Sequence, residues 1–201
     1  MTRVDSLLEA YELKDELRSG WVLRGIEDPE SVAAHTWGTA MLCLLFADEA
    51  GINPNEAVSM ALVHDLAEAR TGDIPTRAEE GAQRIHPDTK EQQEKEVMRD
   101  LANGLASQLF QELWEEYEAR NTPLSQFTKD MDLIDNCLQA LKYERQERYD
   151  KTEDNENFIE YDHLDEFFAT AEPRIQTDIG EELFTTIEER YRNQFDTEVK
   201  Q

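Results

Sequence analysis

The residues best suited to chemistry are two histidines and the acid that follows one of them. His64 and Asp65 lie together in the apolar stretch ALVHDLAEA, and His35 lies in SVAAHTW. No Lys or Arg occurs in residues 55–64, so no cation precedes Asp65 on the same predicted helix. A buried carboxylate is costly unless it is paired or binds a metal. A lone histidine is often only a hydrogen-bonded core residue, but the His-Asp pair favours a metal site.

A metal site of this kind needs a further ligand from elsewhere in the chain. The best candidate is Asp132 in FTKDMDLIDNCLQALKYE, and Asp130 and Asp135 compete with it from the same predicted helix. Asp135 shares the face of Asp132 approximately because it lies one helical turn later, whereas Asp130 points elsewhere. Two imidazoles and two carboxylates suit one divalent cation, which could be Mn²⁺, Co²⁺, Zn²⁺, Fe²⁺ or Mg²⁺. An open coordination position would lower the pKa of bound water and polarise a phosphoryl oxygen, which predicts hydrolysis of phosphate esters.

The elements that must position these residues are predicted to be helices. Apolar residues recur at helical spacing and no run of alternating β-branched residues occurs, so we expect an all-α fold with five or more core helices. Ser31 and Asn53-Pro54 are typical helix starts, and Gly51 is a typical helix end. The predicted helices cover residues 4–20, 31–49, 54–70, 88–120 with an interruption near Asn103-Gly104, 125–149, 164–171 and 181–195. Residues 20–30 are expected to form an ordered loop.

The polar segment KTEDNENF divides the chain into two parts. Residues 1–150 hold all the candidate ligands and are expected to form the metal-binding domain. Residues 151–201 are expected to form a C-terminal helical extension that packs on the same domain. The extension is too short to be treated as a separate domain.

Composition limits the partners of this protein. It has 46 acids and 20 bases, and the formal net charge of −26 would repel nucleic acid and anionic membranes. Such an acid excess is typical of proteins from high-salt cytoplasms, although the plainer interpretation is simply an acidic protein. The chain has no apolar stretch of about 20 residues and no apolar signal segment at its start, so we expect a soluble cytoplasmic protein. Cys43 and Cys137 are then expected to be buried, reduced thiols.

Several other conspicuous side chains match no motif. His86 and His163 lie in polar surroundings and are predicted to be surface residues. Leu113, Trp114 and Tyr117 in QELWEEYE predict a helix packing stripe or a dimer surface, not a cofactor site.

Three segments of the chain together resemble the 5′-deoxynucleotidase-like group of HD-domain proteins. They are GWVLRGIEDPESVAAHTW, LVHDLAEARTGDIPT and KDMDLIDNCLQALKYE, and the resemblance covers roughly residues 4–147. It implies an all-α fold, a single divalent metal and release of inorganic phosphate from a nucleoside 5′-monophosphate. It also implies a homodimer, which is common among such proteins. Carried over by position, the metal ligands are His35, His64, Asp65 and Asp132, the last because it ends the pattern Lys-x-x-Asp.

The resemblance also implies which acids handle protons. Glu68 lies one helical turn after His64, and Asp73 belongs to the TGD segment; in such proteins these acids lie beside the metal and the phosphate. Glu68 could orient or deprotonate the attacking water. Asp73 could do the same, or could protonate the leaving 5′-oxygen.

Binding of the substrate requires positive charge in so acidic a protein. Arg24 is the nearest cation in the Trp-containing loop and is the first candidate for a phosphate fork, with Arg18 and Lys129 as further candidates. Trp21 is expected either to pack on the nucleoside and help exclude a 2′-hydroxyl or to be an ordinary core aromatic. Gly20 precedes Trp21 where some bacterial members of the group carry Arg, so the chain resembles the eukaryotic and archaeal branch more.

The leading hypothesis is therefore a metal-dependent phosphohydrolase that removes the 5′-phosphate from deoxynucleoside monophosphates. A second hypothesis keeps the site but changes the substrate to a nucleoside triphosphate, a cyclic nucleotide or an alarmone. A third is a metal-stabilised sensor module that binds a nucleotide without turnover. The presence of both Glu68 and Asp73 argues against this third hypothesis, because a binding module has little need for them.

Overall fold

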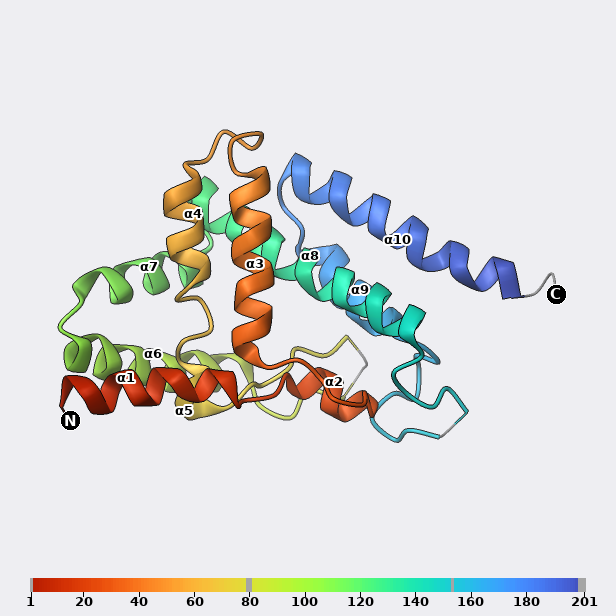
Figure 1. Cartoon of the computed structure of the whole chain (residues 1–201), viewed down its shortest axis with the longest axis horizontal. Helices are drawn as coiled ribbons and strands as arrows, with labels where there is room; N and C mark the ends of the chain where they lie inside the picture. The colour runs from red at the N-terminus through yellow and green to blue at the C-terminus, as the bar shows by residue number, and fades with distance from the viewer. Residues whose placement is uncertain (1, 79–80, 153, 199–201) are drawn as a thin grey trace.

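Helices make up the framework of the protein. The computed structural model describes residues 2–78, 81–152 and 154–198, and within these ranges it contains helices, turns and one isolated antiparallel bridge between Leu17 and Ser31, but no strand (Figure 1). The predicted all-α class is confirmed. The elements are α1 (Arg3–Tyr11), η1 (Glu12–Lys14), α2 (Ser19–Arg24), α3 (Val32–Phe46), α4 (Pro54–Ala61), α5 (Glu68–Thr71), α6 (Pro87–Leu105), α7 (Gln108–Ala119), α8 (Pro123–Gln146), α9 (Asp165–Ala171), η2 (Glu172–Arg174) and α10 (Asp178–Glu198).

Helix α8 is the centre of the larger hydrophobic core. It packs against α3, α4, α7, α9 and α10, and Figure 1 shows it crossing behind the upright pair α3 and α4. Phe127, Met131, Ile134 and Cys137 of α8 are fully buried in this core, which explains why this long helix is ordered along most of its length. A helix buried on several sides holds any side chain that it carries in one position.

A second, smaller core lies under the N-terminal helix. It joins η1 and the start of α3 to α6 and α7, with Leu13, Val32, Leu101 and Trp114 buried in it. Of the three residues predicted to form a packing stripe or a dimer surface, Trp114 is buried in this core, Tyr117 is also buried, and Leu113 is only partly buried. Cys43 and Cys137 are buried free thiols, as predicted.

Local capping signals were reliable. The hydroxyl of Ser31 accepts a hydrogen bond from the amide of Ala34 and begins α3. Asn53 caps α4 with Pro54 at the first helical position, as the sequence predicts.

The segment that carries His64 and Asp65 is not the regular helix that we predicted. Helix α4 ends at Ala61, and residues 62–67 form a series of turns before the short helix α5. The imidazole Nδ1 of His64 lies 2.7 Å from the carbonyl oxygen of Ala61, which a continuing helix would offer to the amide of Asp65. His64, a predicted metal ligand, therefore lies just past the end of helix α4.

Four further features of the helices differ from the predictions. The short helix α2 covers residues 19–24 and so takes up the first part of the loop expected over residues 20–30, and the first helix ends at Tyr11, well before Gly20. Helix α6 runs through Asn103-Gly104 without the predicted interruption. A Cβ atom at Gly104 would come within 2.0 Å of the Ser6 hydroxyl, so this glycine permits close packing of α1 against α6 and does not break the helix. Helix α10 is also much longer than predicted.

The C-terminal helices pack on α8. The buried carboxylate of Glu144 at the end of α8 accepts hydrogen bonds from the hydroxyls of Tyr149 and Tyr191, which ties α10 to the core. His163 lies 3.6 Å from the same carboxylate and is only partly exposed, so the surface prediction for it is wrong in part, whereas His86 is exposed as predicted. No helix within the described ranges is long and apolar enough to cross a membrane.

Candidate metal centre and active site

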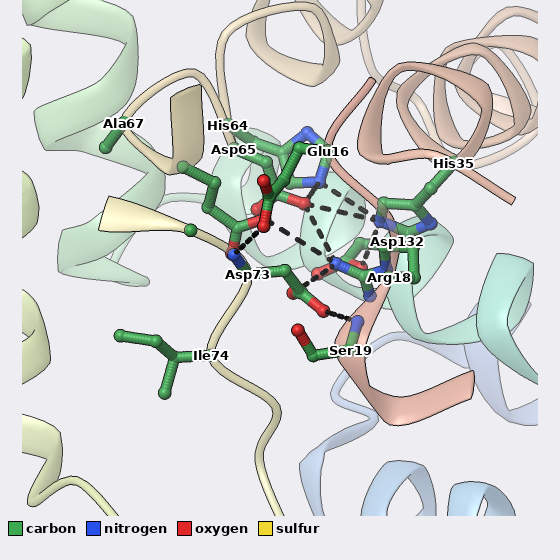
Figure 2. A network of polar contacts seen from close by, with 12 residues as sticks. Glu16, Arg18, Ser19, His35, His64, Asp65, Ala67, Asp73, Ile74 and Asp132 are labelled. Carbon is green, nitrogen blue, oxygen red and sulfur yellow. Dashed lines mark hydrogen bonds and ion pairs between the residues drawn. The ribbon is translucent and has the colours of Figure 1, made fainter. Parts of the chain in front are cut away.

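Four predicted ligands from separate parts of the chain meet at one point. His35 comes from α3, His64 and Asp65 from the turns after α4, and Asp132 from α8 (Figure 2). The Nε2 atoms of the two imidazoles lie 3.3 Å apart. Asp132 Oδ1 lies 3.0 Å from Nε2 of His35, and Asp65 Oδ2 lies 3.1 Å from Nε2 of His64. Asp65 Oδ2 is also 3.6 Å from Nε2 of His35.

The other nitrogen of each imidazole is already engaged. His35 Nδ1 lies 2.7 Å from Oδ2 of Asp135, and His64 Nδ1 lies 2.7 Å from the Ala61 carbonyl oxygen. Both acceptors favour the tautomer with a proton on Nδ1, so both Nε2 atoms present lone pairs to one another and to two carboxylates. Lone pairs at these distances repel unless a cation or a proton lies among them. A divalent cation with N and O ligands fits this donor set, and His35, His64 and Asp132 form one compact ligand group.

The pKa shifts indicate the same demand for positive charge. Burial and the charge of Arg18 lower the pKa of His35, but hydrogen bonds to Asp132 and Asp135 outweigh them and raise it to about 10. Burial raises the pKa of Asp65, but the neighbouring His64, Arg18 and His35 lower it below its usual value. A bound metal would replace the proton on His35 as the source of that charge.

The carboxylate of Asp132 is held from several sides. Its Oδ2 accepts hydrogen bonds from the Tyr117 hydroxyl at 2.7 Å and from the Lys129 ammonium at 2.6 Å, which leaves Oδ1 facing the imidazoles. Asp130 points away and accepts hydrogen bonds from the backbone of Gln176 and Thr177. Asp135 instead orients the imidazole of His35. The residue pattern left three acids as alternative ligands, and Asp130, Asp132 and Asp135 thus lie in three different positions.

Arg18, Glu68 and Asp73 surround the metal centre. Arg18 Nη1 lies 3.1 Å from Asp73 Oδ1 and 3.3 Å from Asp65 Oδ2 (Figure 2). Its Nη2 donates a hydrogen bond to Asn136. Asp73 Oδ2 also accepts a hydrogen bond from the amide of Ser19, so both of its oxygens are engaged. Glu68 is buried, and its Oε2 has no hydrogen-bond partner among the described residues.

The electrostatic surroundings of Glu68 favour its protonated form. Burial raises the pKa of Glu68 well above its ordinary value, and the charges of Asp65 and Asp73 add to this effect. Lys90 of α6 opposes it from 3.6 Å. Arg18 also opposes it, with Nη1 3.9 Å from Oε2 of Glu68. A carboxyl group with a raised pKa and an oxygen that accepts no hydrogen bond is suited to holding a proton.

Arg24 does not join the other predicted site residues. Its guanidinium is buried, donates a hydrogen bond to the carbonyl of Asp162 and lies over the rings of Tyr149 and Phe158. It does not line the cavity in front of the metal centre. The phosphate-fork prediction therefore disagrees with its placement, because long-range aromatic packing turns Arg24 toward the C-terminal segment.

Trp21 lies in the cavity wall but is almost completely covered. Its ring stacks on Phe167 with 3.8 Å between centroids, and its Nε1 donates to Glu30. A Cβ atom at Gly20 would approach the Phe167 ring to 3.1 Å, so the small residue before Trp21 leaves room for this stack. Phe167, and not the buried Trp21, is the more accessible aromatic of the pair.

A cavity opens in front of the candidate metal centre, and Asp65 and Asp132 lie in its wall. Its wall includes the predicted Arg18, Lys129 and Glu68, but also several residues that the sequence interpretation missed. These are Arg77, Lys90, Asn136, Phe158, Glu166, Phe167, Thr170 and Arg174. Asp135 was found as a competitor ligand from its helical spacing, but these other residues carried no comparable sequence signal.

Comparisons with known proteins agree with this geometry. The HD domain family profile matches residues 10–171. The 5′-deoxynucleotidase HDDC2 of Bos taurus is 38% identical over 136 residues, which is 66% of this chain and 63% of that protein. The 5′-deoxynucleotidase HDDC2 of Xenopus laevis is 37% identical over 150 residues, 71% of this chain and 72% of that protein. The match thus spans slightly less than two thirds of the Bos taurus protein.

Solved structures share the fold over nearly the whole chain. A crystal structure of a Pyrococcus horikoshii OT3 protein has a TM-score of 0.71 and 29% identity, and the match covers 94% of this chain and 98% of that one. A conserved hypothetical protein of Pyrococcus furiosus has a TM-score of 0.71 and 30% identity, covering 94% and 99%. Because the family profile matches most of the chain, the chain belongs to the HD domain family.

Proposed function

We propose that this protein is a metal-dependent 5′-nucleotidase that releases inorganic phosphate from deoxynucleoside monophosphates. The observation that carries the proposal is the pair of imidazole Nε2 atoms that face two carboxylates at the base of a cavity. The names of the related Bos taurus and Xenopus laevis proteins support this substrate class.

We propose His35, His64, Asp65 and Asp132 as the residues that hold one divalent cation. When bound, such a cation supplies Lewis-acid charge to a phosphoryl oxygen and lowers the pKa of water. Asp135 and the Ala61 carbonyl hold the imidazoles in the tautomer that the cation requires. The identity of the cation is to be tested with Mn²⁺, Co²⁺, Zn²⁺, Fe²⁺ and Mg²⁺ in turn.

The remaining residues would bind the phosphoryl group and handle protons. Arg18 and Lys129 place cationic groups beside the carboxylates at the cavity base, where they would stabilise charge on the phosphoryl oxygens. Glu68, whose surroundings favour its protonated form, is the proposed donor of a proton to the leaving 5′-oxygen, and the proton that the attacking water loses would protonate it again. Asp73 is engaged through both oxygens, so its proposed role is to hold Arg18 and the backbone of Ser19 in place.

The test is phosphate release by the metal-loaded protein from dAMP and dTMP. Activity is expected for the wild-type chain and is expected to be lost in Asp65→Ala. Full activity after chelation and gel filtration would remove the metal from the proposal.

A screen across mono-, di-, tri- and cyclic nucleotides separates this function from its alternatives. Turnover of a triphosphate or cyclic nucleotide in place of the monophosphates would support the second hypothesis. A nucleotide that raises the melting temperature without any phosphate release would support the sensor hypothesis.

We also propose a homodimer. Helix α3 exposes Trp37, Leu44 and Leu45, which are 67%, 55% and 61% accessible. Large exposed apolar side chains grouped on one helix are typical of an association surface. Light scattering of the wild-type chain and of Leu45→Glu tests this: a dimer that becomes a monomer is expected.

A further inference from the structure

Arg174 is a partly buried arginine in the cavity wall that lacks a partner. It lies at the end of η2 and lines the same cavity as Asp65, Glu68 and Asp132. Within the described ranges it makes no hydrogen bond, ion pair or ring contact, although the chain contains 46 acids. The other arginines of this cavity are engaged, since Arg18 contacts Asp65 and Asp73 while Arg77 contacts Glu166. An unpartnered guanidinium in a cavity is a feature that a bound anion would explain.

The backbone that follows Arg174 is firmly held. The Asp130 carboxylate accepts hydrogen bonds from the Gln176 amide at 3.1 Å, the Thr177 amide at 2.7 Å and the Thr177 hydroxyl at 2.6 Å. A Cβ atom at Gly180 would come within 2.4 Å of the same carboxylate, so α10 begins in close contact with α8. Asp130 thus anchors the chain beside Lys129, its neighbour in sequence. This anchoring holds Arg174 on a rigid part of the fold.

Arg174 shares the cavity with Lys129 and with Asp132. Lys129 donates to Asp132, one of the proposed metal ligands. Arg174 and Lys129 therefore contribute positive potential to one region of the cavity.

We propose that Arg174 is a substrate-binding residue that donates hydrogen bonds to the phosphoryl oxygens of the nucleotide. This inference rests on the proposed function, because the phosphoryl group is the only anionic group of a nucleoside monophosphate. The planar guanidinium presents paired donors that match a phosphate. The C-terminal extension thereby supplies a phosphate-binding arginine to the cavity. Arg24, which was predicted for that role, is turned away from the cavity.

The experiment compares Arg174→Gln and Arg174→Lys with Arg192→Gln in the full-length protein. Arg192 is an exposed arginine of α10, so its replacement removes the same charge away from the cavity. Steady-state kinetics with dAMP and the Mn²⁺-loaded protein are expected to give a KM raised about 10- to 100-fold in Arg174→Gln. Arg174→Lys is expected to recover part of this loss, and Arg192→Gln to match the wild-type KM.

Calorimetric titration with inorganic phosphate gives a second measurement that needs no turnover. Phosphate binding to the metal-free protein is expected to weaken in Arg174→Gln by a similar factor and to be unchanged in Arg192→Gln. If Arg174→Gln fails to fold, Arg174→Ala takes its place in the same two measurements, and a wild-type KM and phosphate affinity in that variant overturn the proposal.

The possible failures are distinguishable. An active wild-type protein with equal KM values in Arg174→Gln and Arg192→Gln overturns the role of Arg174 and leaves the proposed function intact. An inactive wild-type protein removes the proposed function, and the phosphate titration then decides for Arg174. Weakened phosphate binding in Arg174→Gln alone supports an anion site there, whereas equal or undetectable binding in all proteins overturns it.

Discussion

The two walls of the cavity differ in origin and in how their residues are held. The metal wall consists of His35, His64, Asp65 and Asp132, whose second contacts come from nearby groups such as the partly buried Asp135 and the buried Tyr117. The C-terminal wall consists of Phe158, Glu166, Phe167 and Arg174, which reach the cavity only because α9 and α10 pack on α8. The first wall is defined by residue types with a specific chemistry. The second shows that ordinary residues acquire a role through placement alone.

Loss of a proposed metal ligand should lower kcat/KM more than any other change. That result would show that the reaction depends on the metal wall. His64→Ala removes one Nε2 ligand, so we expect kcat/KM to fall by at least about 1000-fold, because charge stabilisation at the phosphoryl group is lost. Phosphate release and calorimetric Mn²⁺ binding measure this. The matched control is His86→Ala, which removes an exposed imidazole and should leave both unchanged. Activity retained in His64→Ala would contradict the comparison.

Loss of the acid behind a ligand should have an intermediate effect. Asp135→Asn replaces the carboxylate that holds Nδ1 of His35, and we expect metal affinity to weaken about 10- to 100-fold. Metal titration followed by calorimetry provides the measurement. The exposed Asp48→Asn removes the same charge elsewhere and should bind metal normally. Wild-type affinity in Asp135→Asn would mean that the fold alone orients His35.

Replacing Arg24 should affect stability and not catalysis. Arg24→Gln removes the contacts of a buried guanidinium with Asp162, Tyr149 and Phe158, at an expected cost of about 1–3 kcal/mol in the free energy of unfolding. Urea denaturation measures the loss, and KM per folded molecule should not change. A raised KM without a loss of stability would mean that Arg24 binds substrate. Arg24 would then not differ in role from Arg174.

The aromatic part of the C-terminal wall should have a smaller effect on substrate binding. Phe167→Ala removes the ring that stacks on Trp21 at the cavity wall, and we expect KM to rise about 2- to 10-fold, with kcat nearly unchanged. Tyr11→Ala, which removes an exposed ring from α1, serves as the control. A fall in kcat equal to that of a metal-ligand variant would show that the two walls are not separable.

The smallest expected effect is a pH dependence of stability that comes from Glu94, which lies 3.5 Å from Lys90. Burial raises the pKa of Glu94 to about 7, although Lys90 opposes the shift. The folded protein therefore binds this proton more tightly than the unfolded chain, and Glu94 destabilises the fold as pH rises from its ordinary pKa through about 7. Glu94→Gln should raise the melting temperature at pH 8 more than at pH 4. An equal change at both values would mean that the carboxyl group titrates normally.

Local interactions determined much of the fold from the sequence alone. The caps at Ser31 and Asn53 depend on hydrogen bonds to residues a few positions away, so they are readable in the chain. The helical class follows from periodicity, which is also a local property. The candidate ligands were readable because His and Asp in apolar surroundings have few other uses, and the structure brings His35, His64, Asp65 and Asp132 together.

Only the tertiary structure decided the direction of the remaining side chains. Arg18 and Arg24 lie less than two helical turns apart, yet Arg18 enters the metal centre and Arg24 turns toward Tyr149. The choice between them depends on residues more than 100 positions later, which pack around one arginine and leave the other free to reach Asp65 and Asp73. Arg174 reaches the cavity for the same reason, since Asp130 anchors the backbone beyond it. Long-range packing sets these directions, and no local pattern in the sequence encodes it.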